Sequence, residues 1–147
     1  MTNAAGPVLL AYDGSDLAKL AIEEAGRQLA PGRAAIVLCV WQPSDVGFEP
    51  VGGQHFDAQA ADEVEKAAEE TAAYGATLAE TAGFRAQGVT VQGAPTWKGI
   101  IAVAEERGAS LIVLGSHRRS GIAGHLLGSV ADAVAAHAEC AVLILRR

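Results

Sequence analysis

The residues that follow the fourth apolar stretch of the chain are of the types that bind anions. Gly115 ends that stretch, Arg118 and Arg119 come soon after it, and Gly128 and Ser129 open a helical pattern. The first N–H groups of a helix have no helical partner, and the helix dipole favours negative charge there. A strand, a glycine-bearing loop with two cations and a helix N-terminus with a hydroxyl therefore predict a phosphate site. The alternative is an ordinary strand-to-helix loop whose glycines serve only the turn.

A carboxylate near the start of the chain is the second candidate for chemistry. Asp13 follows the apolar run 8–12 and begins the turn cluster Asp-Gly-Ser-Asp. If the first and fourth strands are neighbours where the winding of a parallel sheet reverses, Asp13 faces residues 115–130 across a crevice. A carboxylate in that place accepts hydrogen bonds from ribose hydroxyls or from the adenine amine, which predicts an adenine nucleotide. The alternative is that Asp13 only caps a helix.

The elements that must position these residues alternate along the chain. Apolar runs predict strands at 8–12, 34–41, 89–91, 111–114 and 141–145. Three- and four-residue periodicity predicts helices at 16–30, 57–82, 95–107 and 128–138. Strict alternation of short apolar strands with amphipathic helices predicts an α/β fold. Its core is an open twisted parallel sheet with right-handed crossovers and helices on both faces.

Two segments of the middle of the chain carry more specific predictions. In the long alanine-rich helix, the acidic residues lie largely outside the apolar stripe and predict a solvated face rather than a metal site. The predicted inward stripe is Ala60, Val64, Ala67, Thr71, Tyr74 and Leu78. Residues 42–56, with two prolines and three glycines, predict a loop of about fifteen residues. Such a loop is either a lid over a site or simply mobile.

Length and composition limit the class of protein. With 147 residues, half of them hydrophobic and 5% aromatic, we expect one domain spanning 1–147. The formal net charge of −6 argues against a nucleic-acid surface. No apolar run approaches the roughly 18 residues of a membrane span, and no secretory signal opens the chain. We therefore expect a cytoplasmic protein without nucleic-acid or membrane partners.

The sequence offers no convincing catalytic or metal-binding constellation. Neither a Gly-x4-Gly-Lys-Ser/Thr phosphate loop nor a Gly-x-Gly-x-x-Gly after the first strand is present. Cys39 and Cys140 lack a Cys-x-x-Cys partner and a suitably spaced histidine, so two buried thiols are expected. His117 and His125 flank the glycine loop, where surface or packing roles are commoner than catalysis. We expect no enzyme, with weak ATP hydrolysis at most a by-product of binding, and no metal site.

Several blocks in the right order resemble the universal stress proteins over essentially the full length of the chain. The first is Asp-Gly-Ser at 13–15, and another is the ending His-Ala-x-Cys-x-Val-Leu at 137–143. The family's signature, Gly-x2-Gly-x9-Gly-Ser/Thr-Val, falls on Gly115, Gly128, Ser129 and Val130. The signature's second glycine is replaced by Arg118. The resemblance implies a Rossmann-like, nucleotide α-hydrolase-like fold with five strands in the order 3-2-1-4-5.

The resemblance also implies a function and a set of site residues. It implies a stress-response module that binds ATP or a related adenine nucleotide, with or without Mg²⁺, between the first and fourth strands. The residues carried over are Ala11, Asp13 and Val40 around adenine and ribose, Leu114 and Gly115 at the start of the loop, and Gly128, Ser129 and Val130 at the phosphates. Arg118 and Arg119 are candidate phosphate partners or, alternatively, plain surface charge. The family also has members that bind no nucleotide, so Arg118 motivates the alternative of a dimeric interaction or scaffold protein.

The last strand is where we expect two copies of the chain to associate. In the family, dimers form through this terminal strand, so Val142 to Leu145 is the predicted homodimer interface. An apolar strand at the edge of a sheet favours such pairing. The alternative is that Arg146 and Arg147 blunt the edge and leave a monomer.

Overall fold

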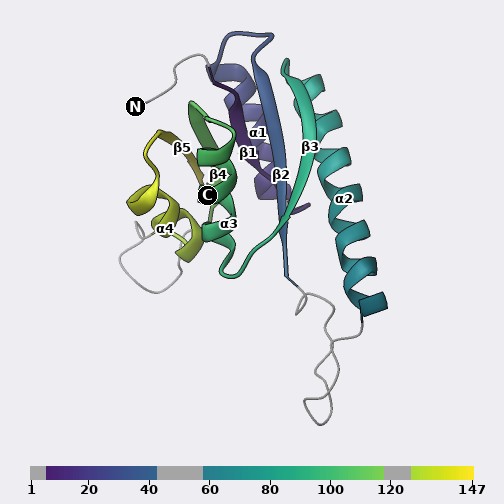
Figure 1. Cartoon of the computed structure of the whole chain (residues 1–147). Coiled ribbons are helices and arrows are strands. Elements are labelled where there is room, and N and C mark those ends of the chain that lie inside the picture. Colours follow the sequence, from purple (N-terminus) through teal and green to yellow (C-terminus); the bar gives the residue numbers. More distant parts are fainter. Residues whose placement is uncertain (1–5, 43–57, 118–126) are drawn as a thin grey trace.

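The computed structural model describes residues 6–42, 58–117 and 127–147 (Figure 1). Strands and helices alternate as β1 (Val8–Ala11), α1 (Asp16–Gln28), β2 (Ala34–Trp41), α2 (Ala58–Thr81), β3 (Arg85–Gln92), α3 (Thr96–Glu106), β4 (Leu111–Ser116), α4 (Ser129–His137) and β5 (Ala141–Arg146). All pairings are parallel, and the strand order is β3-β2-β1-β4-β5. The predicted fold class and strand order are confirmed.

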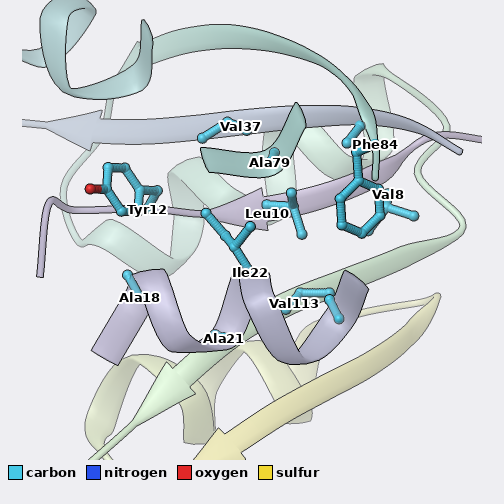
Figure 2. Close-up of a cluster of buried hydrophobic side chains, with 12 residues drawn as sticks. Val8, Leu10, Tyr12, Ala18, Ala21, Ile22, Val37, Ala79, Phe84 and Val113 are labelled. Atoms are coloured by element: carbon cyan, nitrogen blue, oxygen red, sulfur yellow. The ribbon is translucent and has the colours of Figure 1, made fainter. Parts of the chain in front are cut away.

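Alternate residues of the central strands supply two separate cores. On β1, Leu10 faces α1 and α2, whereas Leu9 lies in the cluster made with α3 and α4. Figure 2 shows the first cluster, in which side chains of α1 such as Ile22 meet Leu10 and Val37 of the sheet. Helices therefore cover both faces, as predicted. The central strands β1, β2 and β4 are largely buried on both sides because each face of the sheet carries helices.

Three strands extend beyond their apolar residues. β3 runs over Arg85–Gln92 instead of 89–91, and β5 includes Arg146. β4 continues through Gly115 to Ser116, so Gly115 lies inside the strand and does not end it. The ladder is made by backbone groups, which pair whatever the side chain is. Polar residues can therefore extend a strand where they remain exposed, as Gln87 does on the edge strand β3.

Helix α2 turns a different face to the sheet from the one predicted. Its buried positions are Ala68, Ala72, Gly75 and Ala79, while Tyr74 of the predicted stripe is 58% exposed. A Cβ atom on Gly75 would lie 2.6 Å from both the Tyr12 ring and Val37. Small residues on this face allow a close approach that larger ones would prevent. Of the predicted stripe, Val64 and Leu78 still pack at the margins of the buried clusters.

The structure bears on three other predictions. Cys39 is buried on β2, Cys140 is half-buried before β5, and neither forms a disulfide. Across residues 6–42, 58–117 and 127–147, no helix combines the length and apolarity needed to span a bilayer. The predicted loop at 42–56 lies, apart from Gln42, outside the described residues.

Candidate functional site

A pocket of about 410 Å³ opens at the carboxyl ends of β1 and β4. These neighbouring strands are followed by helices on opposite faces of the sheet, which is the usual place for a ligand in an open α/β sheet. Eight of the nine predicted site residues line the pocket: Ala11, Asp13, Val40, Leu114, Gly115, Gly128, Ser129 and Val130. The ninth, Arg118, lies outside the described residues, as does Arg119.

One wall of the pocket is apolar and is assembled from several elements. It is formed by Ala11 of β1, Leu38 and Val40 of β2, Ile100 of α3 and Leu114 of β4. Leu38, Ile100 and Leu114 are buried in the core beneath, so the wall rests on well-packed side chains. A wall of this kind suits the flat apolar part of a ligand.

The start of α4 supplies the hydrogen-bond donors of the pocket. Gly128 is the N-cap residue in extended backbone, and no side chain among the described residues caps the helix. The first helical hydrogen bond runs from the Asp132 N–H to the Gly128 carbonyl at 2.9 Å. The helix itself therefore has no acceptor for the N–H groups of residues 129–131, all of which line the pocket. Together with the helix dipole, these donors favour an anion.

The start of α4 is held by a residue that the sequence prediction missed. The buried Ser116 hydroxyl oxygen, at the end of β4, accepts a hydrogen bond from the Gly128 N–H at 2.7 Å. The Ser116 carbonyl accepts another from the Arg147 N–H at 3.1 Å. Ser116 follows the signature's first glycine directly, but nothing in its type or position distinguishes it from any other hydroxyl residue beside a loop.

Asp13 stabilises the turn at the start of α1 and also lines the pocket. Its Oδ1 accepts a hydrogen bond from the Ser15 N–H at 2.9 Å, across Gly14 with φ +88°. Ser15, not Asp13, is the N-cap of α1, because its hydroxyl accepts from the Ala18 N–H at 3.1 Å. Asp13 is exposed and lines the same pocket as the start of α4.

The structure adds several other residues to the pocket. They are Tyr12, Ser15, Leu17, Ala18, Leu38, Thr96, Ile100, Ser116, His117 and Ala131. The alternation of β2 could have indicated Leu38, two residues before Val40. Thr96 could not be found from local pattern, because it belongs to the crossover that follows β3; there its hydroxyl accepts from the Gln42 amide at 3.2 Å.

Two observations describe the chemistry available at the pocket. Burial, with Tyr74 and Asp13 close by, raises the pKa of the Tyr12 phenol above its ordinary value of 10.0, so it is a neutral hydroxyl at neutral pH. In the part of the chain that the structure describes, no group of three His, Cys, Asp or Glu side chains could hold a metal ion. The pocket therefore offers hydrogen bonds, apolar contact and one carboxylate.

The fold and pocket define a doubly wound α/β protein with an open crevice where the winding reverses. The profile of the universal stress protein family matches residues 5–146, and the chain belongs to that family. Universal stress protein YxiE of Bacillus subtilis is 31% identical over 145 residues, covering 95% of this chain and 97% of the relative.

Solved structures with the same fold agree with this assignment. The Methanocaldococcus jannaschii protein MJ0577 has a TM-score of 0.77 and 23% identity, covering 99% of this chain and 98% of that one. A universal stress protein solved in complex with cAMP has a TM-score of 0.66 and 26% identity, covering 98% of both chains. The similarity to MJ0577 shows the fold alone. The second similar structure is of a protein in complex with cAMP, which is an adenine nucleotide.

Proposed function

We propose that the protein is a regulatory module of the stress response that binds ATP or a related adenine nucleotide between β1 and β4. The observation that carries this proposal is the meeting of an apolar wall, the uncapped start of α4 and the Asp13 carboxylate in one pocket. The cAMP complex of a related protein supports an adenine nucleotide as the class of ligand.

Each part of the pocket suits one part of that ligand. The base would lie against Ala11 and Val40, and the Asp13 carboxylate would accept a hydrogen bond from a ribose hydroxyl. The phosphates would meet the start of α4, where the N–H groups and the helix dipole favour anions. The proposed phosphate residues are Gly128, Ser129 and Val130, with Leu114 and Gly115 beside them. Because the described residues offer no metal cluster, Mg²⁺ would enter with the phosphates of ATP.

The test is titration calorimetry with ATP and Mg²⁺, together with analysis of any nucleotide released by acid from freshly purified protein. Ala11→Phe should abolish binding by filling the apolar wall. Ala73→Phe, on the exposed face of α2, is the matched control and should leave binding unchanged. A folded wild-type protein that gives no heat and carries no nucleotide would contradict the proposal. That result would favour a scaffold protein without nucleotide.

We also propose that β5 pairs with its counterpart in a second copy. β5 is an edge strand, and its residues 142–145 are only half-buried, whereas Val8 to Leu10 on β1 are fully buried. Light scattering should give twice the 15.0 kDa chain mass. Leu145→Lys should reduce the mass to one chain, and Val91→Lys on the opposite edge strand is the control. A wild-type mass of one chain would contradict the homodimer.

A further inference from the structure

Ser116 makes a hydrogen bond that joins the end of β4 to the start of α4. Its side chain is 4% exposed, and its hydroxyl oxygen lies 2.7 Å from the Gly128 nitrogen. The two residues are twelve positions apart and stand on either side of residues 118–126. The bond therefore connects two elements that the backbone joins only through a long segment.

The geometry around this bond leaves little freedom. A Cβ atom on Gly128 would lie 3.3 Å from the Ser116 hydroxyl oxygen, so the backbone of the N-cap residue passes close to it. The hydroxyl's own proton points to the His117 carbonyl at 3.5 Å, at the long limit for a hydrogen bond. The short bond from Gly128 is thus the stronger of the two.

We infer that Ser116 is a positioning residue that holds the N–H groups at the start of α4 in line with the pocket. This inference rests on the proposed function and deepens it, because it assigns Ser116 to the phosphate end of the ligand. The residue acts through Gly128: without the serine acceptor, the helix start can shift, and its donors no longer converge on one point.

The arrangement of the pocket makes the effect selective for phosphate. The apolar wall comes from β1, β2, α3 and Leu114 of β4, and none of its side chains is a partner of the Ser116 hydroxyl, which is bonded to Gly128 and His117. Adenosine, which lacks phosphate, would use that wall and Asp13 alone. Loss of the Ser116 hydroxyl should therefore lower the affinity for ATP while leaving the affinity for adenosine nearly unchanged.

The variants are Ser116→Ala, which removes the acceptor, and Ser116→Cys, whose larger thiol is only a weak acceptor. Either variant should lower the affinity for ATP about tenfold, which is the effect of one lost hydrogen bond. The affinity for adenosine should change by less than about twofold. Ser110→Ala is the matched control just before the other end of β4. Ser110 is also buried, at 9% exposure, and its hydroxyl donates to the Gly6 carbonyl and accepts from Arg33, both at 2.8 Å.

A second measurement needs no nucleotide. Residue-resolved amide exchange should show the Gly128 N–H exchanging about tenfold faster in both Ser116 variants than in the wild type. The amides of β5, which pair with the backbone of β4, serve as an internal control and should not change. Ser110→Ala should leave the Gly128 amide unchanged.

The outcomes separate this inference from the proposed function. Faster Gly128 exchange with a selective loss of ATP affinity supports the inference. Unchanged Gly128 exchange, equal losses for ATP and adenosine, or an equal loss in Ser110→Ala would overturn it. If wild-type protein binds no ATP, the proposed function fails, and the Gly128 exchange alone decides whether Ser116 positions the start of α4.

Discussion

The side chain of Leu17, at the start of α1, packs directly on the backbone of Gly115 in β4. A Cβ atom on Gly115 would lie 2.6 Å from Leu17 Cγ. Gly115 has no positive φ, so a glycine is needed there for space and not for backbone freedom. Both residues line the pocket, and their contact brings the start of α1 and the end of β4 together.

Gly115→Ala should therefore destabilise the fold by about 1–3 kcal/mol and weaken adenine nucleotide binding, since the added methyl group displaces Leu17. Urea unfolding and calorimetry would measure the two effects. In the double variant with Leu17→Ala the clash disappears, so the combined loss should be smaller than the sum of the single losses. Simple additivity would show that the two residues do not interact in this way.

Gly75→Ala should also destabilise the protein, by about 1–3 kcal/mol, because the new methyl group would meet the Tyr12 ring and Val37. The sign is informative: in an unpacked helix the same change stabilises by up to about 1 kcal/mol. Ala73→Gly on the exposed face of α2 would calibrate that propensity effect. A stabilising Gly75→Ala in urea unfolding would rule out the close approach of α2.

Ser15→Ala should destabilise the protein by about 1 kcal/mol, because the hydroxyl that accepts from the Ala18 N–H is lost from the N-cap of α1. Ser129→Ala is the control, since Ser129 is exposed and lies inside α4, after its N-cap Gly128. Its effect on thermal or urea unfolding should stay within about 0.5 kcal/mol. Equal losses in the two variants would argue against the capping role of Ser15.

Stability should fall at alkaline pH because of Tyr12. Its pKa in the folded protein is raised above 10.0, chiefly by burial. In the unfolded chain the phenol ionises at its ordinary pKa, so above that pH the unfolded state binds fewer protons, and the free energy of unfolding decreases as pH rises. Tyr12→Phe lacks this phenol and should lose less stability between about pH 9 and pH 11. If the free energy of unfolding, measured with urea, falls equally with pH in the wild type and in Tyr12→Phe, the Tyr12 phenol makes no such contribution.

The order of elements and much of the pocket could be predicted from the sequence. Apolar runs and helical periodicity are local properties, so they indicated each strand and helix before any contact was known. Parallel strands bring their carboxyl ends to one edge, which is why Asp13 and Gly128 could be expected in the same pocket. That these residues bind a nucleotide stays a prediction.

The face that α2 turns inward could not be predicted. The hydrophobic pattern favours burial of the stripe that contains Tyr74. In the structure the stripe that contains Gly75 packs on the sheet, because its small residues allow the helix to come close to the sheet. The full length of β3 could not be predicted from hydrophobicity either, since Arg85 and Gln87 join the strand through backbone pairing with β2.

The sequence by itself determined the alternation of strands and helices, because hydrophobic period and turn residues act over a few neighbouring positions. Only the tertiary structure decided which helix face is buried, that Leu17 covers Gly115, and that Ser116 accepts from Gly128. Those contacts depend on distances between elements far apart in the chain, and such distances are set by how the side chains of the whole core fit together.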